Sequence, residues 1–337
     1  MNWYLQSGNE ADVAISTRIR LARNINGFTF ALKKDGEREA LENKVKEVLF
    51  GIGYGLKFLK LKDMDDITKM SLVEKHLISP NFALEQNENG SILINEEENI
   101  CIMIGEEDHL RIQVFSSGLD LENTMNLAIE LDEKLGELLG YDISKKYGYL
   151  TRCPSNVGTG LRASVMLHLP AISMTGNDKK ILESLSGLGM VVRGGYGENS
   201  EIEGQIYQIS NYQTLGISEN EIIENLKVMV EQIIKQERQA RKFLTKDVLS
   251  LEDKIYRSYG ILINARKIST QETMKLLSMV KMGTDLGILP EMTDKKIKEL
   301  YLYTKPANLQ KYKQEQYEII ERDIKRAEII KQILNES

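Results

Sequence analysis

The pattern of apolar and polar positions divides the chain into two unequal parts. Before about residue 240, segments in which apolar and polar residues alternate are mixed with segments in which apolar residues recur every three to four positions. Alternation is typical of a strand with one covered face, and the longer spacing is typical of an amphipathic helix. After residue 240 only the helical spacing occurs. The pattern therefore predicts an α+β domain over 13–240 and an all-α domain over 241–337.

The expected strands alternate clearly enough for their faces to be assigned. They cover residues 12–23, 91–116 in two or three pieces, 161–169, 190–193 and 204–210. One side of the run 161–169 is apolar, and Arg162 and His168 lie on the other side, which we expect to be open. Arg18 and Arg20 likewise share one side of the first strand. Strands with one covered and one open face predict a large antiparallel sheet flanked by helices.

The expected helices lie on both sides of the boundary. They cover residues 37–50, 121–139, 178–188, 219–244, 247–263, 271–282, 294–304 and 314–334. Ser218 and Glu221 have the spacing of a capping box at the start of the fourth helix. The last helix carries an apolar stripe, which predicts that it packs on another element. The stripe consists of Tyr317, Ile320, Ile324, Ala327, Ile330 and Leu334.

Composition narrows the class of protein. The 337 residues are 28% charged, with a net charge of −6, and they contain no apolar run long enough to cross a membrane. A net negative surface disfavours binding to nucleic acid. The two cysteines, Cys101 and Cys153, are far apart, and the three histidines form no cluster with metal-ligand spacing. We therefore expect a cytoplasmic protein with no membrane contact, no nucleic-acid partner and no protein-bound metal site.

The candidate chemistry lies in arginines on the open face of the expected sheet. Four of them lie on three expected strands, two of these on one face of the first strand, and the fifth opens a glycine-rich segment. The five are Arg18, Arg20, Arg111, Arg162 and Arg193. Arginine offers planar, bidentate donors to phosphate oxygens, so convergence of the five would form a cage for a polyphosphate. The alternative is that several of them pair with the abundant carboxylates, and that 161–169 is a buried strand with one surface arginine.

At these arginines the chain resembles a known family. The runs STRIRLARN, EEDHLRIQ, LTRCPSNVGTGLRASVMLHLP and RGGYGE resemble the ATP:guanidino phosphotransferases, the family of the creatine and arginine kinases. VEKHLISPN, GLRASVMLHLPAI, YGENSE and RDIKRA look most like its bacterial branch, which acts on arginine in proteins. The resemblance implies a phosphagen-kinase catalytic domain of the glutamine-synthetase-like type. It also implies ATP with Mg²⁺ as the donor and a guanidinium as the acceptor.

The resemblance also implies site residues. Its nucleotide-binding positions fall on Ser16, Thr17, Arg18, Ile19, Arg20, His76, Arg111, Arg162, Ala163, Ser164, Val165, Met166, Arg193, Gly194, Gly195, Tyr196, Gly197 and Glu198. Its catalytic carboxylates fall on Glu107 and Glu198, and its active-site cysteine falls on Cys153.

The chemistry independently requires a carboxylate near the acceptor. Freely deprotonating a guanidinium at pH 7 would cost roughly 7 kcal/mol, so a positioned base must take the proton during transfer. We expect Glu107 to be the principal base and Glu198 its partner on the glycine-rich segment. Residues 106–108 could instead be an acidic, solvated turn. Cys153 could be a small buried filler, although Cys101 fits that description better, and the role of Arg152 beside it is open.

The last expected helix carries a second arginine motif. Arg322 and Arg326 lie one turn apart beside Asp323, an arrangement that is usually a solvated set of charges. The RDIKRA run matches the RDxxRA motif of the bacterial branch. The resemblance therefore implies an allosteric phosphoarginine site formed by Arg322, Asp323, Arg326 and Ala327 in a dimer-forming helical domain.

Three functions are consistent with these observations. The leading hypothesis is a protein-arginine kinase that marks proteins for Clp-type proteolysis and inactivates a heat-shock repressor, as part of stress response and protein quality control. The resemblance then implies the repressor CtsR, the activator McsA, a ClpC-type unfoldase and a second copy of the chain as partners. The alternatives are a kinase of free arginine or another small guanidino compound, and a non-catalytic phosphoarginine-binding adaptor.

Overall fold

A large antiparallel sheet is the centre of the fold, as the alternation predicts. The computed structural model describes residues 2–32, 34, 36–84, 90–177, 181, 185, 187–194, 202–290 and 292–335. Eight strands of these residues pair in the order β2-β3-β4-β5-β1-β8-β10-β9. Their bounds are β1 Ala14–Arg23, β2 Lys57–Lys60, β3 Ser91–Ile94, β4 Ile100–Glu106, β5 Asp108–Ser117, β8 Leu161–His168, β9 Met190–Arg193 and β10 Ile206–Asn211. The expected region 91–116 is three strands, and β2 was not predicted because it is a short, half-exposed edge strand.

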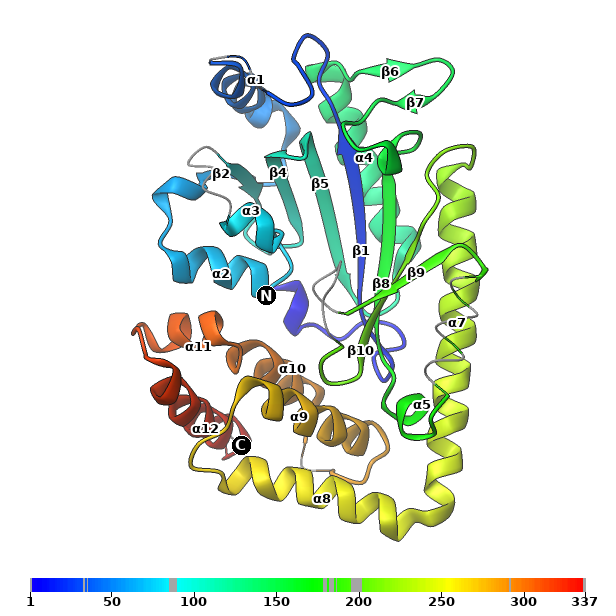
Figure 1. Ribbon diagram of the computed structural model, residues 1–337, viewed down its shortest axis with the longest axis vertical. Coiled ribbons are helices and arrows are strands. Elements are labelled where there is room, and N and C mark those ends of the chain that lie inside the picture. The colour runs from blue at the N-terminus through cyan, green and yellow to red at the C-terminus, as the bar shows by residue number, and fades with distance from the viewer. Residues whose placement is uncertain are drawn as a thin grey trace.

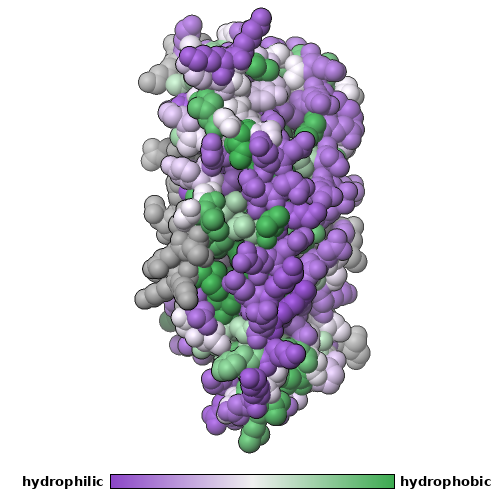
Figure 2. Space-filling model, turned by 90° about the vertical axis from the view of Figure 1, so that its right-hand side faces the viewer, coloured by the Kyte–Doolittle hydropathy of each residue, from purple (hydrophilic) through white to green (hydrophobic). Residues whose placement is uncertain are grey.

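One face of this sheet forms the apolar core. Ile19 and Leu21 of β1 are fully or almost fully buried on this face, while Arg18 and Arg20 point to the other. Helices α4 (Leu121–Leu139) and α7 (Glu219–Leu244) cover this apolar face, and α1 (Glu37–Ile52) packs against α4 (Figure 1). The outward side of the molecule on which α7 lies is mostly hydrophilic (Figure 2). The capping box at Ser218 and Glu221 starts α7 as predicted.

Short elements surround the sheet. The short helices are η1 (Trp3–Leu5), η2 (Leu61–Asp63), α2 (Asp66–Glu74), α3 (Pro80–Leu84), η3 (Pro154–Asn156), α5 (Pro170–Met174) and η4 (Thr245–Asp247). A small hairpin consists of β6 (Ile143–Ser144) and β7 (Gly148–Tyr149). The expected helix 178–188 lies mostly outside the described residues.

Residues 248–335 form a purely helical part that lies beneath one end of the sheet (Figure 1). Its helices are α8 (Val248–Asn264), α9 (Thr270–Asp285), α10 (Asp294–Tyr303), α11 (Pro306–Lys313) and α12 (Ile319–Asn335). Helix α11 was not predicted. It starts at Pro306 and ends at Lys313, because the next residue, Gln314, has a left-handed φ of +55°. The expected helix 314–334 therefore begins only at Ile319. Helix α7 runs through the expected boundary at residue 240. No described helix is both long and apolar enough to span a membrane.

The expected apolar stripe of the last helix is partly wrong. Ala327 and Ile330 are buried, but Ile320 is 66% exposed and Ile324 is 39% exposed. The covered face of α12 instead includes Arg326, Ile329 and Ile333, while Ile319 and Ile320 in the first turn are exposed. His168 also differs from expectation. It lies on the same sheet face as Arg162, but it is fully buried and contacts Ser278 of α9, so the helical part covers this end of the face.

Candidate active site

The structure brings the five expected arginines together on the open face of the sheet. Pairing register explains why: Arg20 of β1 lies opposite Arg162 of β8, and Ala22 lies opposite Arg111 of β5. Directly paired residues of antiparallel strands point to the same face, and alternate residues of one strand share a face. Arg18 therefore joins this face. So does Arg193, because β9 pairs it with Gln208 and β10 pairs Gln208 with Met166.

These arginines line one cleft of about 480 Å³, called the arginine cleft below. Its other polar walls come from the β4–β5 turn, from residues after α2 and from the loop before β8. They include His76, Ser79, Asn81, Glu106, Glu107, Gln113, Cys153, Ser155, Asn156 and Gln208. Arginines, a cysteine and glutamates that lie far apart in the sequence thus face a common space.

Like charges in the arginine cleft oppose one another. Burial and repulsion by Arg111, Arg162 and Arg193 lower the pKa of Arg18 to about 10. Burial and the same kind of repulsion hold the pKa of Arg20 well below its usual value, and Glu106 only partly offsets this. The alternative of simple carboxylate pairing applies to Arg111, whose guanidinium lies 2.5 Å from Glu106 and 2.7 Å from Glu107. A polyanion in the cleft would relieve this repulsion.

Glu107 lies at the tip of the turn between β4 and β5. Glu106 and Asp108 pair across this turn, so Glu107 alone makes the reversal and adopts a left-handed φ of +63°. For a residue other than glycine this conformation costs on the order of 1–3 kcal/mol, and such residues cluster at functional sites. Its carboxylate is 37% exposed and accepts a hydrogen bond from Arg111. The acidic turn is therefore part of the cleft and not merely solvated.

Asp108 joins this turn to the loop that carries Cys153. The Asp108 side chain is 1% exposed and accepts hydrogen bonds from the Asn24 side chain at 2.9 Å and from the Arg152 main chain at 2.7 Å. The Cys153 thiol lies 3.0 Å from the Ser155 hydroxyl. The Arg152 side chain is exposed, so this residue contributes its main-chain N–H, and its side chain is not among those that line the cleft.

His76 forms the end of the cleft nearest the helical part. It follows the C-terminus of α2 and has a left-handed φ of +62°. Burial, together with the charges of Lys305 and Arg18, holds its pKa well below the usual value, so the imidazole is neutral at pH 7. The loop that follows is fixed by Gln113, whose side chain donates to the Leu77 carbonyl at 2.7 Å.

Other expected nucleotide-binding residues differ in where their side chains lie. Ser16, Ser164 and Met166 point to the open face, beside Arg18 in a narrow cavity. Ile19, Ala163 and Val165 are fully buried in the core on the other face, and Thr17 donates to the Gly118 carbonyl. Gly194 is described next to Arg193. Four expected site residues lie outside the described residues: Gly195, Tyr196, Gly197 and Glu198.

Several lining residues were not identified from the sequence. Gln113 could have been found because it lies on the same face of β5 as Arg111. Gln208 could have been found because it lies on the open side of β10. Ser79 had no such signal, because its role depends on a contact with Glu106 at 2.8 Å across the cleft. Within the described residues, no group of three or more histidine, cysteine or acidic side chains is arranged to hold a metal ion.

The RDxxRA segment lies on α12, outside the arginine cleft. Arg326 is 1% exposed, and its guanidinium donates to the carbonyls of Thr304 at 2.6 Å and Ile268 at 2.8 Å. It also contacts Asp323 at 2.5 Å. The interpretation of solvated charge is therefore wrong for Arg326. Ala327 is buried, and Arg322 is half-buried.

Comparisons with known proteins agree with this geometry. A family model described as "ATP:guanido phosphotransferase, C-terminal catalytic domain" matches residues 40–240. A second, described as "Protein-arginine kinase McsB C-terminal domain", matches residues 248–337. Curated relatives named protein-arginine kinase from Halothermothrix orenii and Bacillus pumilus are 46% and 43% identical to this chain. The alignments cover 99% and 98% of this chain and 96% and 93% of the relatives.

Solved structures give the same fold at lower identity. The duplicated taurocyamine kinase from Schistosoma mansoni, with bound transition-state-analogue components, is 27% identical with a TM-score of 0.61. That match covers 72% of this chain and 37% of the taurocyamine kinase. A lombricine kinase is 27% identical with a TM-score of 0.60, over 69% of this chain and 68% of the other. The large antiparallel sheet with flanking helices is therefore the phosphagen-kinase fold, here followed by a helical part.

Proposed function

The chain belongs to the ATP:guanido phosphotransferase family and is an ATP-dependent guanidino kinase, and we propose that its acceptors are arginine side chains of proteins. The observation that carries the proposal is the arginine cleft, in which five guanidinium groups face Glu107 and Cys153. Near full-length similarity to relatives named protein-arginine kinase supports a protein acceptor.

Charge in the arginine cleft supports binding of the triphosphate. The cleft arginines would hold the phosphate oxygens and stabilise the charge that develops on the transferring phosphoryl group. Because Arg111 now contacts both Glu106 and Glu107, phosphate oxygens that compete for Arg111 would release Glu107 toward the acceptor. Nucleotide binding would in this way prepare the base.

Glu107 would then orient the acceptor guanidinium and take its proton as the phosphoryl group moves to nitrogen. Cys153, held by the Asp108-anchored loop, would hydrogen-bond the same guanidinium from another side. We propose Glu198 as the second carboxylate from the sequence alone, because it lies outside the described residues. We also propose Mg²⁺ with the nucleotide. Mg²⁺ keeps several waters and binds nucleotide phosphates readily, so the phosphate oxygens would supply most of its ligands.

We propose regulatory roles beyond catalysis on the basis of the family resemblance. Phosphorylated arginine would mark proteins for a ClpC-type unfoldase and its protease and would inactivate the repressor CtsR, with McsA as activator. Phosphoarginine would bind α12, where half-buried Arg322 offers a guanidinium and Arg326 fixes the helix from inside. Residues 241–337 would then be a regulatory domain through which two copies dimerise.

The acceptor proposal is tested by incubating the chain with ATP, Mg²⁺, free arginine and unfolded casein. Mass spectrometry under non-acidic conditions preserves the acid-labile P–N bond, and we expect phosphoarginine on casein and little on free arginine. The reverse distribution would make the chain a small-guanidine kinase, as the names of the taurocyamine and lombricine kinases indicate for those enzymes. Nucleotide binding with no transfer to either acceptor would leave only the adaptor function.

A further inference from the structure

A second cavity adjoins the arginine cleft at the junction of the sheet and the helical part. A narrow cavity beside Arg18 and His76 is also lined by Trp3, Ser16 and Met166. The same Trp3, Ser16, His76 and Met166 line a larger cavity of about 130 Å³, called the junction pocket below. The two cavities therefore adjoin each other, and both have His76 of the arginine cleft in their lining.

The junction pocket is mostly apolar, and the helical part forms one of its walls. Met274 of α9 and Ile297, Tyr301 and Leu302 of α10 face Ala14 and Ile15 of the sheet part across it. Charged side chains, among them Lys75, Lys298 and Asp294, also belong to its lining. A largely apolar pocket with polar groups beside it suits a flat aromatic ligand. Because the junction pocket adjoins the arginine cleft at His76, a ligand that fills both has an aromatic group at one end and phosphates at the other.

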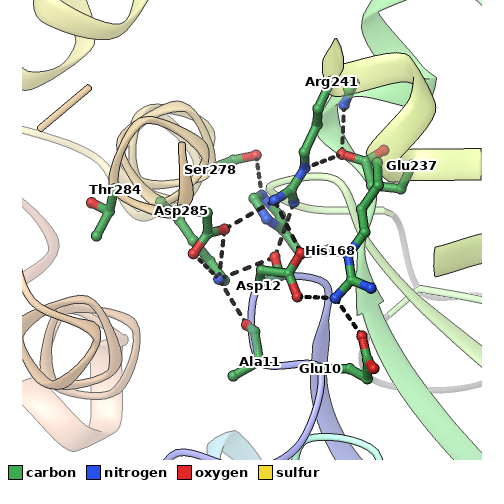
Figure 3. Close-up of polar contacts among 12 residues, drawn as sticks. Glu10, Ala11, Asp12, His168, Glu237, Arg241, Ser278, Thr284 and Asp285 are labelled. Atoms are coloured by element: carbon green, nitrogen blue, oxygen red, sulfur yellow. Dashed lines mark hydrogen bonds and ion pairs between the residues drawn. The ribbon is translucent and has the colours of Figure 1, made fainter. Parts of the chain in front are cut away.

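An ionic cluster holds α9 against the sheet part on one side of the junction pocket (Figure 3). Arg241 of α7 donates to Glu237 at 2.8 Å and contacts Asp285 of α9 at 3.4 Å. Lys281 of α9 contacts Asp285 at 2.9 Å and donates to the Ala11 carbonyl at 3.1 Å. These charges are buried and mutually paired, so separating α9 from the sheet part would leave several of them without partners.

Glu74 holds the helical part on the opposite side. Glu74 is the last residue of α2. Its carboxylate accepts hydrogen bonds from the main-chain N–H groups of Ala307 at 2.7 Å and Asn308 at 2.8 Å. These are orphan donors in the first turn of α11, where a negative charge also interacts favourably with the positive end of the helix dipole. The Lys305 side chain donates to the Glu74 carbonyl at 3.2 Å. His76 follows two residues later and also lines the junction pocket, so one anchor fixes both α11 and this wall of the pocket.

We propose that the helical part is a component of the nucleotide site: α9 and α10 form a wall around the nucleotide base, and Glu74 is a positioning residue that holds this wall in register with His76. This inference rests on the proposed binding of ATP in the arginine cleft. Its consequence is that the helical part controls affinity for the base-bearing end of the nucleotide but not for the phosphates.

The single tryptophan of the chain, Trp3, lines the junction pocket and reports on its occupancy. Titration with ATP is expected to change Trp3 fluorescence, whereas inorganic tripolyphosphate, which lacks the base, is expected to compete with ATP and change the emission far less. Calorimetric titration of each ligand gives its Kd independently of fluorescence and of activity. Equal fluorescence changes for the two ligands, or no change on saturation with ATP, would overturn the proposal.

Leu302→Ala is the matched variant. Leu302 is half-buried and lines the junction pocket, and we expect its truncation to weaken ATP binding about fivefold while leaving tripolyphosphate binding unchanged. Leu276→Ala is the control. This half-buried leucine of α9 packs on the core of the helical part, so it should affect both ligands equally. A Leu302→Ala variant that binds ATP like the wild type would reject the wall.

Glu74→Gln tests the anchor. In this variant the side-chain NH2 of glutamine would face one of the main-chain N–H donors of α11, and that hydrogen bond would be lost. We expect ATP affinity to fall about tenfold and tripolyphosphate affinity to stay unchanged. The KM for ATP should rise more than kcat falls. A folded variant with equal losses for both ligands would contradict a role in positioning. If the wild type binds neither ATP nor tripolyphosphate, the proposed function fails as well. If it binds both ligands and phosphorylates casein, and the variants do not discriminate between them, only this inference fails.

Discussion

The chain uses arginine in two opposite ways. In the arginine cleft, Arg18 and Arg20 are partly buried among other arginines, and the resulting repulsion lowers their pKa values. In α12, Arg326 is almost fully buried, and main-chain carbonyls and Asp323 surround its guanidinium. All three arginines are removed from solvent to some degree. The cleft arginines have too few acidic partners, whereas the hydrogen-bond donors of Arg326 are paired within the protein. We infer that the repulsion among the cleft arginines is relieved when an anionic ligand binds, so these arginines favour binding. Arg326 instead stabilises the fold.

Removal of a cleft arginine should separate activity from stability. We expect Arg20→Gln to lower kcat/KM by about 10³-fold, because one donor to the developing phosphoryl charge is lost. The free energy of unfolding should stay equal or rise, since a repelling charge is removed. Phosphorylation assays and urea denaturation measure the two effects. Arg257→Gln, at an arginine whose side chain is 75% exposed on α8, is the control and should leave both unchanged. A large loss of stability in Arg20→Gln would contradict the comparison.

Glu107, like the cleft arginines, is expected to contribute to activity at a cost in stability. Glu107→Gln should lower kcat by about 10²- to 10⁴-fold because it removes the base. Glu107→Gly should be equally inactive but about 1 kcal/mol more stable than Glu107→Gln, because both variants lose the Arg111 contact and only glycine relieves the left-handed φ. Kinetics and urea denaturation of the two variants provide the comparison. Near-normal transfer by Glu107→Gln would reject Glu107 as the base.

Arg326 should show the reverse of the cleft behaviour. Arg326→Gln leaves the carbonyls of Thr304 and Ile268 with fewer donors and Asp323 without its partner, so we expect unfolding to become easier by about 3 kcal/mol. At a temperature where the variant is folded, tripolyphosphate affinity should be unchanged, since the arginine cleft is intact. Arg322→Gln, at a half-buried neighbour, should cost much less stability. Equal stability of wild type and Arg326→Gln would remove the distinction between the two groups.

The difference between these regions also explains what could be predicted from sequence. On a strand, alternation alone assigns a face, so the convergence of the cleft arginines followed from Arg18, Arg20, Arg111 and Arg162 once a sheet was expected. On α12, helical spacing assigned Arg326 to a polar face. Its partners are main-chain carbonyls of Thr304 and Ile268, and a carbonyl has no signature in the sequence.

Contacts between segments distant in the chain were likewise not predictable. Asp108 looked like part of an acidic turn, but it anchors the Arg152 main chain 44 residues later. Glu74 had no assigned role in the VEKHLISPN run, yet its partners are 233 and 234 residues away. In both cases the carboxylate binds main-chain N–H groups, which every residue except proline possesses. Only the three-dimensional packing selects which of those groups is the partner.

Substitution of His168 should have the smallest effect of these changes. It tests whether the helical part covers the sheet face at His168, the same face on which Arg162 lines the open cleft. Burial, with the charges of Lys281 and Arg241, holds the pKa of His168 well below its usual value. Below a pH of about 6.5 the unfolded chain takes up a proton on this histidine and the folded chain does not, so stability must fall as the pH is lowered from there toward the folded pKa. We expect His168→Gln to reduce the loss between pH 6.5 and 5.5 by up to about 1.4 kcal/mol, measured by urea denaturation at each pH. Parallel stability curves for wild type and variant would show that His168 is protonated in the folded protein, and that the helical part does not seal this end of the sheet.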